Sequence, residues 1–273
     1  MDERKPDEDA VVDQEVSRRG FLTATGAVAV GIGCGVPILA ALASDGAAVK
    51  QDGPRWAMVV DTRKCAEQGD CNACTLKCHE VHNVPEIDSD RQEIKWVWKE
   101  PYKHAFLGQE QEHMREGLKK MPTIVMCNHC ENPPCVRVCP TQATFQREDG
   151  IVLMDMHRCI GCRYCIVACP YGSRSFNWKD PWPRDEETNE AIDRPPNQEF
   201  PTRMRGVVEK CNFCAERLGT DQKPACVEAC ECQALTFGDL NDPESDVRKI
   251  LDEELSQRRR PELGTNPHVF YLV

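Results

Sequence analysis

The chain has 273 residues, of which 18 are cysteine, 34 are Lys or Arg and 45 are Asp or Glu, so its formal net charge is -11. This acidic balance predicts no nucleic-acid partner and argues against an anionic membrane surface, while 17 Gly and 19 Pro without a period exclude a collagen-like chain. Aromatic residues make up only 6% and the mean hydropathy is -0.55. We therefore expect a thin apolar core that something besides side-chain packing stabilises.

The N-terminal segment over residues 1–43 resembles a twin-arginine export signal. A polar, acidic stretch precedes the pair Arg18 and Arg19, Phe and Leu follow, and an apolar segment rich in Ala, Gly and Val ends in an A-x-A-like cleavage site. We predict export to the periplasm by the twin-arginine translocase with cleavage after Ala43, which would also remove Cys34. A retained membrane anchor is the alternative, because about 20 apolar residues can span a bilayer.

The other 17 cysteines form four groups of four, with Cys232 left over. In chain order the groups are Cys65-x5-Cys71-x2-Cys74-x3-Cys78, Cys127-x2-Cys130-x4-Cys135-x3-Cys139, Cys159-x2-Cys162-x2-Cys165-x3-Cys169 and Cys211-x2-Cys214-x11-Cys226-x3-Cys230. The third group has the spacing by which bacterial ferredoxins ligate [4Fe–4S] clusters, and its fourth cysteine then ligates the other cluster of a pair. We expect Cys169 to start a helix, and the proline after it to turn the chain away from the cluster.

Three other chemistries compete with iron–sulfur ligation as explanations of these cysteines. A disulfide framework is common outside the cytoplasm, but disulfide-dense scaffolds are small and rarely show such tight intervals. Zinc needs only two C-x2-C pairs for a tetrahedral site, and the third group supplies more cysteines than that. Covalent haem needs C-x-x-C-H, which this sequence lacks.

The predicted secondary structure repeats around the cysteine groups. Groups two, three and four each read as a loop, a short helix, a turn and a strand. A hairpin is predicted where two strands flank Glu148-Asp149-Gly150. The predicted strands are Trp56–Asp61, Lys95–Trp98, Thr123–Met126, Ala143–Arg147, Ile151–Asp155 and Gly206–Glu209. The fold class is therefore α+β, with two ferredoxin-like modules that each hold two [4Fe–4S] clusters, long loops and a C-terminal helix.

Two segments lie outside this repeat. Residues 179–205 carry five prolines and seven acidic residues, which indicates a long loop that is either a solvated insertion or a docking surface. After it, Asp242 is predicted to cap a helix with Pro243 at its first position. Its apolar stripe is Val247, Ile250, Leu251 and Leu255, and Arg258-Arg259-Arg260 is expected to be solvated charge near the end of this helix.

The cysteine groups in this order, with three further strings, resemble the four-cluster iron–sulfur electron-transfer subunits of the dimethyl-sulfoxide-reductase and polysulfide-reductase type. The strings are Cys127-Asn-His-Cys130-Glu-Asn-Pro-Pro-Cys135, Phe237-Gly-Asp-Leu-Asn-Asp-Pro and Leu263-Gly-Thr-x-Pro-x-Val-x-Tyr-Leu. The resemblance covers residues 55–273. It implies that groups one and four together ligate two clusters, and that groups two and three together ligate the other two.

The resemblance implies a ligand set for each cluster. The sets are Cys65, Cys71, Cys74 and Cys230 (set 1); Cys78, Cys211, Cys214 and Cys226 (set 2); Cys127, Cys130, Cys135 and Cys169 (set 3); and Cys139, Cys159, Cys162 and Cys165 (set 4). The corresponding domains are the signal at 1–43, an outer module from 54–122 with 206–240, a middle module at 123–178, the loop at 179–205 and the C-terminal helix and tail at 241–273.

Two departures from the family pattern concern set 1. The first interval is x5 where x2 is usual, and Glu231 stands where proline would follow Cys230. Cys232 could replace Cys230 as a ligand, but the x3 spacing from Cys226 favours Cys230. Four histidines lie near the cysteines and are expected to be surface groups or to contact ligands without binding iron, namely His79, His82, His129 and His157.

The resemblance implies a one-electron relay without substrate chemistry on this chain, and the sequence contains no Ser/His/Asp set, P-loop or dinucleotide motif. Four clusters in a line would connect an integral membrane quinone-interacting subunit of the NrfD type with a periplasmic partner such as a multihaem cytochrome c, in sulfite or sulfate respiration. The alternatives are a subunit of a molybdopterin-type or nitrite reductase complex, or a structural zinc or disulfide protein. Basic residues that could raise the cluster potentials are Lys77, Arg137, Arg163 and Lys210.

Overall fold

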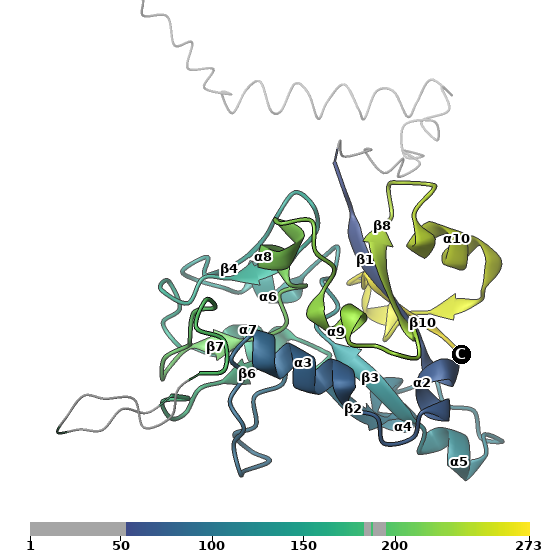
Figure 1. The fold of residues 1–273 in the computed structure, drawn as a ribbon. Helices are drawn as coiled ribbons and strands as arrows, with labels where there is room; N and C mark the ends of the chain where they lie inside the picture. Colours follow the sequence, from purple (N-terminus) through teal and green to yellow (C-terminus); the bar gives the residue numbers. More distant parts are fainter. Residues whose placement is uncertain (1–52, 183–186, 188–194) are drawn as a thin grey trace, which may run out of the picture. The chain divides into compact units, whose positions relative to one another are not determined.

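The computed structural model describes residues 53–182, 187 and 195–273, so the predicted export signal with Arg18 and Arg19 lies outside the described residues. These described residues form one compact unit of short strands and short helices joined by long loops (Figure 1). The α+β fold class is thereby confirmed. Within the described ranges we find no helix with the length and apolarity needed to cross a bilayer.

The elements are short throughout. The strands are β1 Trp56–Asp61, β2 Val97–Pro101, β3 Pro122–Met126, β4 Thr144–Gln146, β5 Val152–Met154, β6 Ser175–Phe176, β7 Val208–Glu209, β8 Leu235–Asp239, β9 Ser256–Gln257 and β10 Val269–Leu272. The helices are α2 Thr62–Glu67, α3 Ala73–Val81, α4 Tyr102–Ala105, α5 Glu116–Lys119, α6 Pro134–Arg137, α7 Tyr164–Ala168, α8 Ala215–Leu218, α9 Ala225–Glu228, α10 Asp246–Glu253 and the 3-10 turn η2 Pro261–Leu263.

The largest sheet joins both ends of the described residues. Its strand order is β8-β1-β10-β9, with β1 parallel to β10 and antiparallel to β8 (Figure 1). Strand β1 is buried on both faces: Met58 and Val60 belong to the main apolar cluster, whereas Ala57 and Val59 pack with Val247 of α10 in a second one. A strand covered on both faces reads as a continuous apolar run. The C-terminal residues are therefore part of the core and no loose tail.

The remaining strands form three two-stranded antiparallel ladders, β2-β3, β4-β5 and β6-β7. The β4-β5 ladder pairs Thr144 with Met154 and confirms the predicted hairpin. Gly150 in its turn has φ +86°, a backbone conformation that favours glycine. Several of these strands lie between cysteine groups along the chain: β3 ends just before Cys127, β4 and β5 lie between Cys139 and Cys159, and β7 ends just before Cys211.

The repeated unit has the predicted order. Helix α6 precedes β4, α7 precedes β6, and α9 precedes β8, with a turn between each helix and strand. The residue three positions after the last cysteine of each of these groups is left-handed in all three copies: Gln142 at φ +54°, Gly172 at +66° and Gln233 at +52°. The similarity in sequence thus reflects the same local backbone path. Cys169 was predicted to start a helix, but it lies at the C-terminal end of α7.

The C-terminal helix begins later than predicted. Ser245 is its N-cap and accepts from Arg248 N at 3.3 Å, whereas Asp242 forms a turn by accepting from Glu244 N. The helix ends at Glu253, so Leu255 lies beyond it and is 90% exposed. Val247, Ile250 and Leu251 pack against the sheet as the predicted stripe requires. The prediction was wrong at both ends because capping and burial depend on the sheet that α10 covers.

The expectation that Arg258-Arg259-Arg260 is solvated charge at a helix end was also wrong. Arg259 is buried, donates from Nε to Ala105 O at 2.7 Å and pairs with Glu100 at 2.9 Å. Arg258 lies over the ring of Phe270. The arginines therefore attach the segment after α10 to the β2-α4 region and to β10.

The end of the 179–205 loop is also anchored. Asn83 donates from Nδ2 to the carbonyls of Asn197 and Phe200 at 2.8 and 2.7 Å, and it accepts from Asn197 N. Arg203 is buried and pairs with Glu209 at 2.7 Å. Asn197, Phe200 and Arg203 thus attach the end of this loop to the core, while Gln198, Glu199, Pro201 and Thr202 between them are exposed.

Candidate iron–sulfur centres

The 17 cysteines of the described residues are all free thiols, and most are buried. Only Cys71 and Cys162 are exposed. Exposed apolar side chains of Ile160, Tyr164 and Val167 flank Cys162. The cysteines therefore form an internal set with two members at the surface.

The middle region contains two small cavities lined by cysteine. One is lined by Cys127, Cys130, Cys135 and Cys169, together with Pro134 and Arg174 among others. The second is lined by Cys139, Cys159, Cys162 and Cys165, together with Met154 and Val208 among others. Each cavity thus takes three cysteines from one group and one from the other.

The outer cysteines also approach one another in two sets. Burial raises the pKa of Cys78 well above its usual range, and the thiols of Cys211, Cys226 and Cys214 add to the rise. The pKa of Cys65 is raised to about 11, mainly by burial: Lys99 opposes the rise, whereas Cys74, Cys232 and Cys230 add to it. Burial raises the pKa of Cys74, and the neighbouring Cys71 adds to this rise.

The sets are neighbours in a definite order. Cys74 of set 1 adds to the raised pKa of both Cys78 and Cys226 in set 2. Burial and the neighbouring Cys127 of set 3 raise the pKa of Cys211 in set 2 to about 12. Burial raises the pKa of Cys165 in set 4, and Cys135 of set 3 adds to this rise. These interactions connect set 1 with set 2, set 2 with set 3, and set 3 with set 4.

The donor chemistry of these sets fits an iron–sulfur cluster. Iron binds thiolates, yet burial raises the pKa of most of these thiols and so disfavours the ionised form. The positive charge of bound iron would reverse that preference, which is why metal binding to cysteine releases protons. A [4Fe–4S] cluster takes four thiolates, and each set supplies four.

Tight loops bring backbone N–H groups close to the sulfur atoms. Ala225 N donates to Cys214 Sγ at 3.4 Å and Ala234 N to Cys230 Sγ at 3.2 Å. Burial acts to raise the pKa of Cys139, but hydrogen bonds from the backbone at 141, 143 and 144 and from the Thr141 hydroxyl lower it overall. Hydrogen bonds to sulfur help to set cluster potentials.

Gly161 is required where the third group passes the β6-β7 region. Its φ is +70°, and a Cβ there would lie 2.5 Å from the carbonyl oxygen of Gly206. The next turn uses Arg163, which also has a left-handed backbone and places its guanidinium over the rings of Phe176 and Trp178.

His82, at the end of helix α3, connects this helix with α8, whose N-cap is Cys214. It is fully buried, with Nδ1 2.9 Å from Cys78 O and Nε2 2.8 Å from Glu216 Oε1. Its ligand atoms, with those of Cys214 and Glu216, lie within 4.8 Å of one another. Both ring nitrogens already have partners, so this group is explained as a hydrogen-bonded link between α3 and α8.

The other three histidines differ in exposure. His129 is fully buried and stacks on Phe213 with ring centroids 3.7 Å apart, whereas His79 is half-buried and His157 is exposed. Burial lowers the pKa of His129 well below its usual range. His129 is therefore a neutral core residue that accepts from Val152 N at 3.1 Å.

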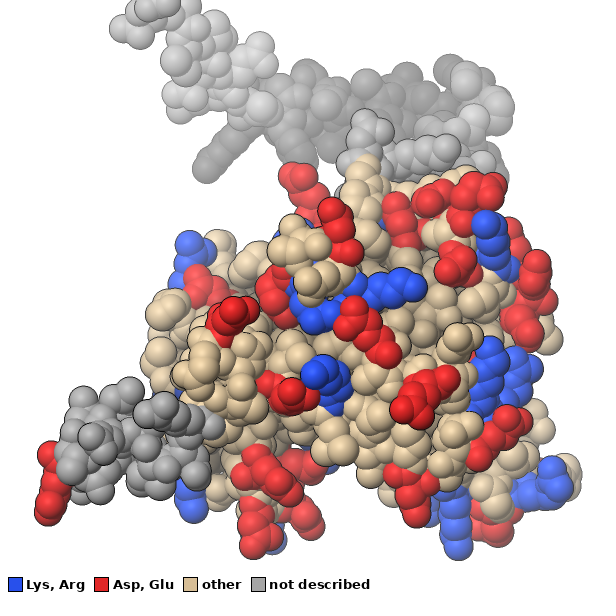
Figure 2. All heavy atoms as spheres, in the orientation of Figure 1, with Lys and Arg blue, Asp and Glu red and all other residues tan. Residues whose placement is uncertain are grey.

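The basic residues expected to influence the clusters are mostly at the surface. Lys77 pairs with Glu80 at 2.9 Å, and Arg137 and Arg163 are exposed. Lys210 alone is buried, and it donates to the carbonyls of Val152 and Cys211. Acidic and basic side chains are interspersed on the face shown in Figure 2. Sequence reasoning considered only basic residues within two positions of a cysteine. It therefore missed the buried Arg174, which lies five positions after Cys169.

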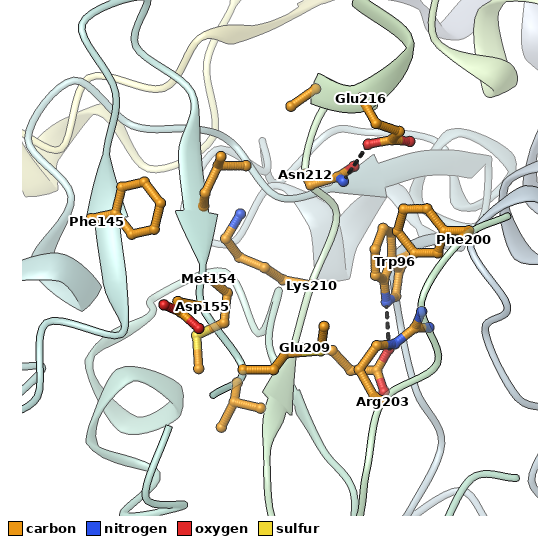
Figure 3. Close-up of a pocket in the computed structure, with 14 residues that line it drawn as sticks. Trp96, Phe145, Met154, Asp155, Phe200, Arg203, Glu209, Lys210, Asn212 and Glu216 are labelled. Carbon is orange, nitrogen blue, oxygen red and sulfur yellow. Dashed lines mark hydrogen bonds and ion pairs between the residues drawn. The ribbon is translucent and has the colours of Figure 1, made fainter. Parts of the chain in front are cut away.

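A cleft of about 400 Å³ (Figure 3) shares Met154 and Val208 of its lining with the cavity of set 4. Its polar groups are already paired: Glu209 accepts from Trp96 Nε1 at 2.9 Å and from Arg203 Nε at 2.7 Å, and Asn212 donates to Glu216 at 2.8 Å. Aromatic rings of Trp96 and Phe200 line the same wall. The bonds of Glu209 hold β7 beside Trp96, which directly precedes β2, and the bond of Asn212 joins it to α8, so these polar groups are structural in this arrangement.

Short strands and helices that gather four sets of four cysteines define a multi-cluster iron–sulfur protein. Comparison with known proteins agrees. The sequence matches the 4Fe-4S dicluster domain family over residues 121–184 and again over 181–240. Two dicluster domains imply four [4Fe–4S] clusters, which confirms the predicted cofactors.

Similar proteins extend the match over nearly the whole sequence. The Hdr-like menaquinol oxidoreductase iron-sulfur subunit 1 of Archaeoglobus fulgidus is 41% identical and covers 94% of this chain and 97% of its own length. The protein NrfC homolog of Haemophilus influenzae is 38% identical and covers 94% of both sequences. A polysulfide reductase component of Wolinella succinogenes is 34% identical over 80% of this chain and 94% of its own length. The protein described here belongs to this family of iron–sulfur subunits, which transfer electrons within oxidoreductase complexes and are not catalytic alone.

Proposed function

We propose that this protein relays single electrons through four [4Fe–4S] clusters held by sets 1 to 4. Support comes from the two middle cavities, each lined by one complete set, and from the mutual approach of the thiols in each outer set. Cys230 completes set 1, and Cys232 is not a ligand in this proposal. The two modules pack in one compact unit, which keeps the clusters at fixed spacing.

The observation that carries the proposal is the order of the sets. Thiols of sets 1 and 2, 2 and 3, and 3 and 4 are electrostatic neighbours. The exposed cysteines Cys71 and Cys162 belong to the two end sets, and no exposed cysteine belongs to the described inner ones. Electrons would enter at one end and leave at the other, with the inner clusters shielded from solvent.

The proposed partners follow from the relatives and from the export signal. One relative is named a menaquinol oxidoreductase subunit, which supports a quinone-interacting membrane subunit of the NrfD type at one end. A multihaem cytochrome c in the periplasm would be the partner at the other end. The complex would then be the one linked to dissimilatory sulfite reduction, with this chain as a subunit like DsrO, exported by the twin-arginine translocase.

A second candidate has support from other relatives. A tetrathionate reductase component of Salmonella typhimurium is 35% identical over 96% of this chain, so a separate catalytic subunit of the molybdopterin type could replace the cytochrome as partner. A nitrite-reductase-linked complex is the corresponding alternative raised by the NrfC homolog.

Purification of the native complex through a tag on this chain tests the proposal. We expect a multi-span membrane protein and covalent c-type haem, visible in the reduced absorption spectrum, to co-purify with the tagged chain. Stoichiometric molybdenum without haem would favour the reductase alternative and contradict the cytochrome partner. A Cys162→Ser variant that still assembles should fail to reduce the haem with a menaquinol analogue, whereas the unaltered chain should do so.

A further inference from the structure

The guanidinium of Arg174 lies in the wall between the two middle cavities. Arg174 is 5% exposed and lines the cavity of set 3. Its Nη1 donates to Thr144 Oγ1 at 3.2 Å and approaches Met154 Sδ at 3.7 Å. Met154 lines the cavity of set 4. Arg174 therefore reaches both sites from one position just before β6.

The titratable groups that affect the pKa of Arg174 are cysteines, and its described contacts include no carboxylate partner. Burial alone would lower its pKa, but the negative charge of ionised Cys135, Cys165 and Cys127, together with a hydrogen bond to Cys135, outweighs burial and raises the pKa. Cys135 and Cys127 belong to set 3, and Cys165 belongs to set 4. An arginine stays charged at any physiological pH, so a permanent positive charge is buried between two sets of cluster ligands.

One nitrogen of this guanidinium has no partner. Nη2 is fully buried and makes no hydrogen bond within the described residues. An unpaired, charged N–H group in the interior is costly, and native proteins normally satisfy it. A cluster in the adjoining cavity would provide sulfur acceptors and negative charge for this nitrogen.

We propose that Arg174 is a positioning residue shared by the clusters of sets 3 and 4, whose charge raises the reduction potentials of both. Reduction adds one electron to a cluster, and a fixed positive charge nearby stabilises that added negative charge. The effect is strong at Arg174 because the site is buried, whereas exposed charges are screened by water and salt. This inference rests on the proposed ligand sets.

The test is a redox titration, followed by EPR, of the anaerobically purified full chain carrying Arg174→Met. Signals from sets 3 and 4 are assigned beforehand with Cys130→Ser and Cys162→Ser. We expect the equilibrium constant for reduction of each cluster to fall at least tenfold, which lowers its reduction potential by about 59 mV for a one-electron couple. The clusters of sets 1 and 2 should keep their potentials and serve as internal controls.

Two further variants separate charge from packing. Arg174→Lys keeps the charge but loses the planar fork, so both potentials should fall less than in Arg174→Met. Arg163→Met removes an exposed arginine that lies beside a cysteine of set 4, and it should shift that cluster by less than half as much. Unchanged potentials in Arg174→Met, a fall in only one middle cluster, or an equal fall in all four would each overturn the proposal.

Iron analysis distinguishes this failure from failure of the ligand sets. If Arg174→Met retains about 16 iron per chain and the potentials do not move, the inference about Arg174 is wrong while the relay stands. If the unaltered chain itself holds fewer than four clusters, the ligand sets are wrong. If Arg174→Met loses clusters on purification, the Arg174→Lys titration decides the question.

Discussion

The sulfur atoms of Cys230 and Cys232 lie 3.7 Å apart. Both contribute to the raised pKa of Cys65. Five thiols rather than four therefore gather at set 1, namely Cys65, Cys71, Cys74, Cys230 and Cys232. Ala234 N donates to Cys230 Sγ, which is the hydrogen bond expected of a cluster ligand. Cys230 also occupies the position whose equivalents, Cys139 and Cys169, precede the left-handed turns of the other repeats.

We therefore predict different outcomes for the two serine variants. Cys230→Ser should perturb the set 1 cluster and lower the iron content from about 16 to about 12 per chain. Cys232→Ser should keep all four clusters. Iron and sulfide analysis with EPR measures both. Loss of a cluster in Cys232→Ser, with normal content in Cys230→Ser, would show that Cys232 is the ligand.

The second prediction concerns Gly161→Ala. A methyl group at this position would collide with the Gly206 carbonyl, and the left-handed backbone adds about 1–2 kcal/mol. We expect the set 4 cluster to be lost in air several-fold faster, measured as bleaching of visible absorption. Gly172→Ala is the matched control, because Gly172 has a similar φ of +66° but no atom within 4 Å of an added Cβ. Equal bleaching rates in the two variants would exclude the close contact as the cause.

The third prediction concerns the buried pair of Arg203 and Glu209, whose side chains are each 2% exposed. Glu209→Gln leaves the Arg203 charge uncompensated beside Trp96, and removing one partner of a buried pair costs about 3–5 kcal/mol. Anaerobic thermal unfolding should show a large fall in midpoint temperature. Glu80→Gln breaks the exposed pair with Lys77 and should cost at most about 1 kcal/mol. Similar losses in both variants would contradict the structural role of the buried pair.

The fourth prediction concerns export. Replacing Arg18 and Arg19 together by lysine should prevent recognition by the twin-arginine translocase. The protein should then accumulate in the cytoplasm with its clusters assembled, as measured by fractionation and immunoblotting. An unchanged periplasmic yield would mean that these residues are no export signal.

Local spacing made much of the site predictable from sequence. The third cysteine group indicates a [4Fe–4S] cluster because its thiols lie within a few residues of one another, at the spacing that ferredoxins use. The β4-β5 hairpin and β1 were also predictable, since turn residues and a continuous apolar run are local signals. The same holds for the repeated turn at Gln142 and Gln233.

Long-range packing explains what was missed. Arg259 pairs with Glu100, a residue 159 positions away, so its burial has no local signal. The hydrogen bond from Thr62 Oγ1 to Leu272 O connects α2 to the C-terminal strand over 210 positions. Arg174 escaped notice for the same reason, because the hairpin of Thr144 and Met154 brings it between two cavities.

The central claim is that one chain holds four [4Fe–4S] clusters that exchange electrons in series. Iron and acid-labile sulfide should be determined on the anaerobically purified chain, with Cys162→Ser as the matched variant. We predict about 16 iron and about 16 sulfide per chain, and about 12 of each in Cys162→Ser if serine cannot retain the set 4 cluster. Zinc in place of iron, or an unaltered cluster content and EPR spectrum in Cys162→Ser, would contradict the account.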